Sequence, residues 1–157
     1  EYSHQLGTDI FTKAIVSEDN KVTLRLPNEG KWIDFWSGET FNAGEQIHRS
    51  YDINKFPLFI KSGAIIPMRI NNDITGIGNE TMKEKRVFVI WPNGISSRNF
   101  HLPVGDGIEY FDCQVNYDQK ARRLTLCSEK SDKWIFILKG DKTVIKEATG
   151  NNVDIML

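Results

Sequence analysis

The sequence predicts an all-β protein, either one antiparallel β-sandwich or two small stacked sandwich modules. Three observations lead to this fold class. Apolar and polar residues alternate with a period of two over most of the chain, turn-forming residues recur at short intervals, and no long segment has the 3.6-residue period of an amphipathic helix. Many short strands separated by turns are typical of sandwiches, whereas a wound α/β fold needs long helical segments.

The first half, residues 1–68, contains the clearest strand pattern. Val22, Leu24 and Leu26 alternate with polar residues, which predicts a strand with one buried face. Turn signals rich in Gly, Pro, Asn and Ser then separate short segments of aromatic and β-branched residues; they lie at residues 27–30, 37–39, 43–45 and 61–63. This spacing predicts antiparallel strands joined by tight turns.

Residues 69–85 lack alternation and predict an irregular connection between the two halves. The second half, residues 86–157, begins with the apolar run from Arg86 to Trp91, which predicts another strand. Composition leaves open whether the halves are two domains or two sheets of one sandwich.

Cys113 and Cys127 are the two cysteines of the chain. They lie on the arms of a predicted hairpin whose loop centres on Lys120, so that the two thiols would face each other. Directly opposed residues have Cβ atoms about 4.5–5.5 Å apart, close enough for a disulfide. The alternative is two buried thiols that pack as small apolar side chains, and a shift of one residue in register would remove the disulfide.

The bulk composition argues against two classes of partner. The 157 residues carry a net charge of −1 with acidic and basic residues interspersed, so no basic stripe is available for nucleic acid. The longest apolar runs are far shorter than the ~20 residues of a membrane helix. We therefore expect neither a nucleic-acid nor a membrane partner. Because the chain begins at Glu1 and shows no signal peptide, we expect it to be a piece of a longer protein.

Three segments of the first half resemble the region that follows the catalytic barrel in glycoside hydrolase family 31. Residues 6–15 (LGTDIFTKAI) are similar to a Leu-Gly-x-Asp strand of the family, with Ala14 where the family usually has proline. Residues 32–39 (WIDFWSGE) resemble its Trp-x-Asp-x-Trp-Thr-Gly-Glu block, and residues 56–67 (FPLFIKSGAIIP) resemble a block that ends in Gly-Ala-Ile-Ile-Pro. In the second half, only Asp106-Gly107 matches the end of a distal-module motif.

The residues of these blocks favour a structural role. Trp32 and Trp36 share one strand face with Asp34, so we expect the tryptophans to cover a sheet and the carboxylate to hold the next turn. The third block predicts four further core residues: Leu58, Ile60, Ala64 and Ile66.

The resemblance implies a non-catalytic accessory domain of a retaining α-glycosidase that hydrolyses oligosaccharides. Catalysis in such enzymes needs two carboxylates about 5–5.5 Å apart. In the family both are aspartates of a (β/α)₈ barrel, which takes about 250 residues, and neither of their sequence blocks occurs here. We therefore expect no catalytic residue, cofactor or metal in this chain. The expected partner is the catalytic barrel of the parent enzyme, and the family favours a periplasmic or secreted location.

An independent carbohydrate-binding module is the alternative, with oligosaccharide as the partner. Trp91, beside a Pro-Asn-Gly turn, and Tyr117, at the hairpin tip, are the best-placed residues for a sugar contact. A complete small lectin or adhesion protein is a third hypothesis.

The other polar residues are weaker candidates for a functional site. A cation could bind the acidic group Asp106, Glu109 and Asp112, but the oxygen spacing of a calcium loop is absent, so a solvated strand end is favoured. Three histidines have no paired spacing and are expected at the surface: His4, His48 and His101. Asn79-Glu80-Thr81 is a glycosylation sequon if the protein is secreted by a eukaryote.

Overall fold

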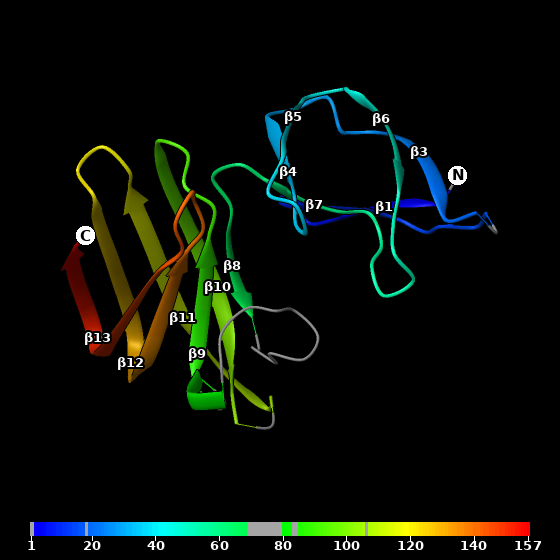
Figure 1. Ribbon diagram of the computed structural model, residues 1–157. Coiled ribbons are helices and arrows are strands. Elements are labelled where there is room, and N and C mark those ends of the chain that lie inside the picture. Colours follow the sequence, from blue (N-terminus) through cyan, green and yellow to red (C-terminus); the bar gives the residue numbers. More distant parts are fainter. Residues whose placement is uncertain (1, 18, 69–79, 83–84, 106) are drawn as a thin grey trace. The chain divides into compact units, whose positions relative to one another are not determined.

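A computed structural model describes residues 2–17, 19–68, 80–82, 85–105 and 107–157 (Figure 1). The chain divides into two compact units, Glu1–Ala64 and Ile65–Leu157. Strands build both units, and the one helical element in the described ranges is the 3₁₀ turn η1 (Glu80–Met82). The predicted all-β class is confirmed. No helical segment in those ranges has the length and apolar character needed to cross a membrane.

The first unit contains seven strands in two sheets. Their bounds are β1 (Ser3–Leu6), β2 (Ile10–Lys13), β3 (Lys21–Arg25), β4 (Lys31–Asp34), β5 (Thr40–Asn42), β6 (Gln46–Ser50) and β7 (Leu58–Lys61). One sheet has the order β1-β2-β7-β4-β5, and β3 pairs with β6 in the other. Every pair of neighbours is antiparallel. Turns between consecutive strands account for the β1–β2 and β4–β5 pairs, whereas β2–β7, β4–β7 and β3–β6 join strands that are distant in the sequence.

Alternation of side chains fills the core between the two sheets of the first unit. The five-stranded sheet contributes Phe11, Trp32, Phe41 and Phe59. The β3–β6 pair contributes the predicted apolar residues Val22 and Leu24, together with Ile47. The rings of Phe11 and Trp32 pack edge to face with centroids 6.1 Å apart, and those of Phe41 and Phe59 are 5.9 Å apart.

The burial of residues 56–67, the third family-like block, differs from the predicted pattern. Ile60 and Ala64 are buried as expected, but Leu58 and Ile66 are half-buried. Phe59 is the residue of β7 that enters the core of the first unit, and it is fully buried. The sequence therefore predicted the wrong face of β7 to point into the core of the first unit, because apolar residues occupy both faces of this strand.

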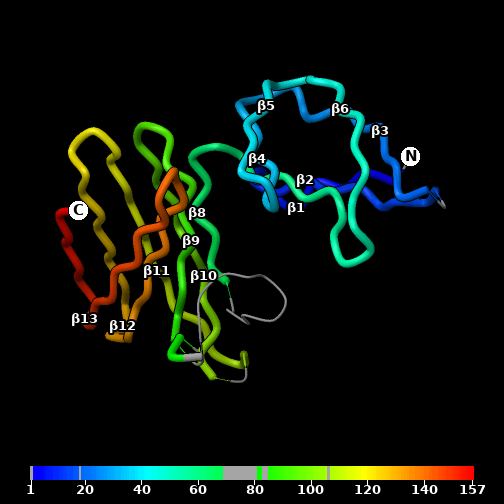
Figure 2. Tube along the Cα trace, viewed as in Figure 1, coloured from blue at the N-terminus to red at the C-terminus, as the bar shows by residue number. Residues whose placement is uncertain are grey.

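The second unit is one sheet of six strands. Their bounds are β8 (Ile65–Met68), β9 (Arg86–Ile90), β10 (Ile95–Val104), β11 (Glu109–Asp118), β12 (Arg123–Leu138) and β13 (Val144–Met156). The order is β10-β11-β12-β9-β8, with β13 on the other edge of β12. Figure 2 shows β10 to β13 as long neighbouring runs of the Cα trace.

β8 belongs to the second unit, although the sequence pattern placed it at the end of the first half. Ile65 to Met68 pair with β9 in antiparallel register, so the division falls at Ala64 and Ile65. The predicted connection at residues 69–85 lies largely outside the described residues and includes η1.

β12 is the central strand of the second unit. Its first part pairs with β11, and its second part pairs in parallel with β9. β13 follows its other edge, with a shift of register between Cys127 and Asp132. A bulge of this kind bends a strand and increases its twist. Both parts of β12 consequently contribute to one core, Leu124 and Leu126 before the bulge and Trp134, Phe136 and Leu138 after it.

Phe88 lies at the centre of that core. Its ring is fully buried and stacks on Trp134 and Phe136, with centroids 5.9 and 6.0 Å away. Phe100 packs against it at 5.2 Å.

We predict that Phe88→Ala lowers the free energy of unfolding by about 3–5 kcal/mol, because it leaves a cavity among three aromatic rings. Urea denaturation followed by tryptophan fluorescence measures the change. Ile95→Ala is the matched control, because Ile95 is 78% exposed and its truncation should change stability little. Equal losses for the two variants would contradict the packing described here.

Candidate functional site

Asp34 holds the turn that follows the family-like tryptophan block. Its Oδ1 accepts hydrogen bonds from the backbone N–H groups of Trp36 and Ser37 at 2.9 and 2.8 Å, and from the Ser37 hydroxyl at 3.1 Å. Gly38 closes the turn with φ of 76° and donates its N–H to the Asp34 carbonyl at 2.8 Å. The expected role of the carboxylate is confirmed by this geometry.

The second carboxylate oxygen of Asp34 connects the turn to β6 and the segment after it. Tyr51 donates its hydroxyl to Oδ2 at 3.0 Å, and a guanidinium nitrogen of Arg49 lies 3.6 Å from the same oxygen. Burial and the neighbouring Asp34 charge raise the pKa of Tyr51. Asp34 is 1% exposed and surrounded by protein donors, so its carboxylate is not available to a substrate.

The two tryptophans of this block pack against protein, as predicted. Trp32 is fully buried and donates its indole N–H to the Glu29 carbonyl at 3.1 Å. Trp36 is half-buried, packs against the same core, and donates its indole N–H to the Phe56 carbonyl at 2.7 Å. The block builds the first unit and presents no sugar-binding platform.

The predicted sugar contacts at Trp91 and Tyr117 are wrong. Trp91 is 3% exposed and Tyr117 is 6% exposed. Tyr117 does not lie at a hairpin tip, because β11 continues to Asp118 and alternation directs the ring into the core with Val115. Neither ring offers the open face that stacking on a sugar requires.

The predicted disulfide between Cys113 and Cys127 is also wrong. Both cysteines are free; Cys113 is buried and Cys127 is exposed. Cys113 lies opposite Ser128, and Cys127 lies opposite Gln114. Successive residues of a strand face opposite sides of the sheet, so this one-residue difference in register separates the thiols onto opposite faces.

The acidic and histidine candidates form separate surface pairs. Glu109 lies 3.6 Å from the Lys130 ammonium, and Asp112 lies 2.8 Å from His101 Nδ1. Asp106 and the sequon residue Asn79 lie outside the described residues. His4 is exposed, and His48 Nδ1 shares a 2.9 Å hydrogen bond with the Thr23 hydroxyl. Within the described ranges, no three His, Cys, Asp or Glu residues group as metal ligands.

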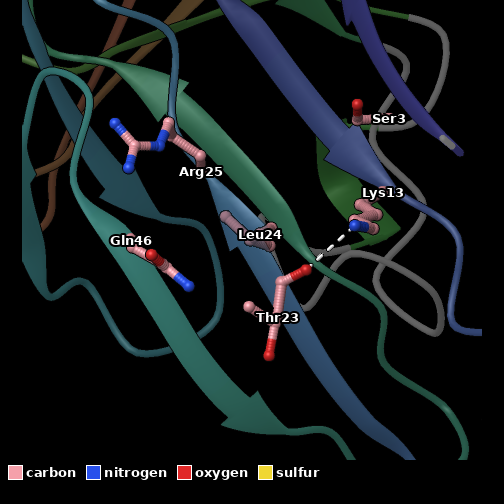
Figure 3. A pocket seen from close by; sticks show the side chains of 6 residues that line it. All are labelled: Ser3, Lys13, Thr23, Leu24, Arg25 and Gln46. Atoms are coloured by element: carbon pink, nitrogen blue, oxygen red, sulfur yellow. Dashed lines mark hydrogen bonds between the residues drawn. The ribbon is translucent and has the colours of Figure 1, made fainter.

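A depression in the first unit lies between the β1–β2 and β3–β6 strand pairs (Figure 3). It has a volume of about 240 Å³ and is lined by Ser3, Lys13, Thr23, Leu24, Arg25 and Gln46. Lys13 donates its ammonium to the Thr23 carbonyl at 2.9 Å, as the dashed line in Figure 3 shows. Its described lining residues include two cations and no carboxylate, so they provide no acid–base pair for glycoside hydrolysis.

A second depression, of about 260 Å³, lies on the outer face of the sheet in the second unit. Its polar lining residues come from three neighbouring strands: Asn116, Thr125, Cys127, Asn152 and Asp154. Sequence reasoning missed this group. The available signal is that several asparagines occupy strand positions, where asparagine is depleted.

Comparison with known proteins finds a similar domain in glycosyl hydrolases and related enzymes. A family model described as the glycosyl hydrolase family 31 C-terminal domain matches residues 1–66. An isomaltosyltransferase of Sporosarcina globispora is 31% identical over 120 residues, which are 74% of this chain and 11% of that enzyme.

Solved structures extend the likeness over most of the chain. The cycloalternan-forming enzyme from Listeria monocytogenes, in complex with a pentasaccharide substrate, superposes with a TM-score of 0.66 and 29% identity, over 87% of this chain and 13% of its own. An α-xylosidase from Xanthomonas citri shares the fold, with a TM-score of 0.76 and 15% identity over 99% of this chain and 19% of its own. The chain thus spans less than a fifth of each of these relatives.

We predict that Asp34→Ala lowers the free energy of unfolding by about 2–4 kcal/mol, because the Tyr51 hydroxyl and two backbone N–H groups lose their acceptor. Thermal and urea denaturation measure the loss. Asp52→Ala provides the control, because the Asp52 side chain is 82% exposed and pairs with Lys55 at 3.5 Å. A loss no greater than that of the control would show that Asp34 does not hold the turn.

We predict that the two thiols react at very different rates. Burial, followed by the neighbouring Cys127, raises the pKa of Cys113 to about 11, so almost no thiolate is present at pH 8. Iodoacetamide should add one carbamidomethyl group, at Cys127, to the native chain and two to the urea-unfolded chain. Mass spectrometry of tryptic peptides locates the adducts. Equal labelling of both cysteines in the native chain would contradict the register of β11 and β12.

Proposed function

Because the chain belongs to glycoside hydrolase family 31, through the C-terminal domain that residues 1–66 match, we propose that it is a non-catalytic accessory module of an enzyme acting on α-glycosidic bonds. The module packs beside a catalytic barrel and stabilises it. The observation that carries this proposal is the small share of each relative that the chain spans, 11% of the isomaltosyltransferase and 13% of the cycloalternan-forming enzyme.

The chemistry of the two depressions supports a non-catalytic role. Among the residues that the structure describes, one depression is lined by no carboxylate and the other by one, Asp154. That carboxylate is engaged by Arg123 at 2.9 and 2.5 Å in a bidentate pair. A retaining glycosidase needs two carboxylates about 5–5.5 Å apart, one as nucleophile and one as acid and base. In this proposal both are supplied by the barrel.

An apolar row on the first unit offers a surface for the barrel. The row lies on the sheet face opposite Phe11 and Phe59 and contains one residue from each of four neighbouring strands: Leu6 on β1, Ile10 on β2, Ile60 on β7 and Ile33 on β4. Leu6 is 59% exposed, Ile10 and Ile33 are half-buried, and Ile60 between them is buried. Apolar side chains that remain partly exposed on one sheet face, here Leu6, Ile10 and Ile33, are typical of surfaces that contact another domain.

A second candidate activity for the parent enzyme is transfer of a glycosyl group to another sugar. Two relatives with comparatively high identity are named for such products or transfers, the isomaltosyltransferase at 31% and the cycloalternan-forming enzyme at 29%. Hydrolysis and transfer both begin by cleaving an α-glycosidic bond. Incubation of the parent enzyme with maltose separates them, because hydrolysis yields only glucose and transfer yields longer oligosaccharides.

We predict that the purified 157-residue chain releases no nitrophenol from nitrophenyl α-glucoside. We also predict that Leu6→Asp in the parent enzyme lowers the melting temperature of that enzyme without changing its KM. The aspartate would introduce a charge into the apolar contact with the barrel. Calorimetry and steady-state kinetics measure these effects, and Gln5→Asp is the matched control because Gln5 is exposed on the neighbouring position of β1. Hydrolysis by the chain alone would refute the accessory role.

A further inference from the structure

We propose that the outer face of the β10–β13 sheet binds a neutral oligosaccharide chain. The proposal rests on the register of four strands, the hydrogen-bonding state of their outward side chains, and a pair of stacked rings at one end. It assigns a ligand site to the second unit. That the ligand is a sugar is inferred from the side chains of this face. That the sugar is an α-linked glucose oligomer rests on the function proposed above.

The strand register places polar side chains in two neighbouring rows. The first row contains one residue from each of four neighbouring strands: Asn99 on β10, Gln114 on β11, Cys127 on β12 and Asn152 on β13. We call these four cross-strand partners the amide row. Ser97, Asn116, Thr125 and Asp154 form the next row, two residues along each strand. Strands lie about 4.7–4.9 Å apart, so the amide row extends for about 14 Å. This length accommodates more than one pyranose ring.

The amide row has unused hydrogen-bonding capacity. The side chains of Asn99, Gln114 and Asn152 make no hydrogen bond to another described residue, although each amide carries two donor hydrogens and an acceptor oxygen. The next row is partly paired, with Ser97 to Asn116 at 2.6 Å and Asn116 to Thr125 at 3.3 Å. A sugar hydroxyl both donates and accepts, so it matches the open amides.

Asparagine is an unfavourable choice for these positions if they serve only to be solvated. Asn99, Asn116 and Asn152 all lie within strands, where asparagine is depleted and threonine or a β-branched residue packs better. Their placement on one face is therefore a cost to the sheet. Recognition of hydroxyl groups is a function that offsets that cost.

The charge of this face points to a neutral ligand. Arg123 is paired with Asp154, and His101 is paired with Asp112. Neither row contains a lysine or arginine that could neutralise a run of phosphates. Neither row contains an aromatic residue, Met or Arg, whereas the core of a protein–protein interface is enriched in these residues. Nucleic acid and protein are accordingly weaker matches than a polyhydroxyl chain.

Aromatic rings flank the amide row at one end. His101 follows Asn99 on the same face of β10, and its ring stacks on Tyr110 with centroids 4.9 Å apart and planes inclined by 5°. Tyr110 is 50% exposed. An exposed tyrosine combines an apolar ring, which can pack on the C–H face of a pyranose, with a polar hydroxyl. The face thus has the two chemical features by which proteins recognise sugars.

The exposed thiol of Cys127 provides a direct probe, because it lies within the amide row. We predict that maltohexaose slows the alkylation of Cys127 in the purified chain in a saturable manner, with a millimolar dissociation constant. NMR titration of side-chain amide signals should shift those of Gln114 and Asn152 with the same constant. Cellohexaose, which has the same sugar units in β linkage, is the comparison ligand.

Gln114→Ala and Asn152→Ala should each weaken binding by about five-fold, the size expected for loss of one hydrogen bond. Asn54→Ala is the matched control, because Asn54 is an exposed amide in a turn of the first unit. All three positions are exposed, and a thermal melt verifies that each variant folds.

The possible outcomes separate this inference from the proposed function. Saturable binding of maltohexaose that is weakened by the two face variants supports the site. Absence of binding, or binding unchanged by Gln114→Ala and Asn152→Ala, overturns it. Binding of cellohexaose in place of maltohexaose keeps the sugar site but contradicts an enzyme of α-glycosidic bonds. Hydrolysis by the chain alone contradicts the accessory role without affecting the site.

Discussion

The hydrogen-bond ladder of β12 is the constraint on which the second unit depends. This strand of 16 residues pairs with β11, β9 and β13, so it connects the whole sheet. Both of its parts contribute apolar side chains to one core. The irregularity between Cys127 and Asp132 re-aims the strand, and Leu126 and Trp134 then pack in the same cluster.

In the first unit, a buried carboxylate has a comparable local role. Asp34 satisfies backbone donors of its own turn with one oxygen and the Tyr51 hydroxyl with the other. The carboxylate between the two tryptophans thus has a structural role and is not a catalytic aspartate exposed to substrate. In the second unit, alternation places polar side chains such as Gln114 and Asn152 on the outer face of the sheet, where they are exposed.

The parts of the fold that depend on short-range patterns were predictable from the sequence. Alternation identified the all-β class and the Val22–Leu24 strand, and turn chemistry identified the role of Asp34. Register was not predictable, because it depends on the loop. The hairpin of β11 and β12 closes with Asp118 opposite Arg123, and Arg122 takes a positive φ of 52°. Its centre therefore lies half a residue beyond Lys120, which is enough to move Cys127 to the other face.

The amide row could not be predicted for the same reason, because it requires the register of four strands at once. The burial of Tyr117 and Trp91 was not predictable either. Each lies near a turn in the sequence, but burial depends on where the strand ends and what covers it.

The parallel pairing of β9 with β12 also affects how the protein folds. Arg86 pairs with Trp134, and both β10 and β11 lie between these two residues in the sequence. Contacts between residues so distant along the chain slow folding, because the entropy of closing a long loop opposes them. During synthesis, the edge of β9 that pairs with β12 therefore stays unpaired until β12 has emerged, and an unpaired strand edge exposes the nascent chain to aggregation.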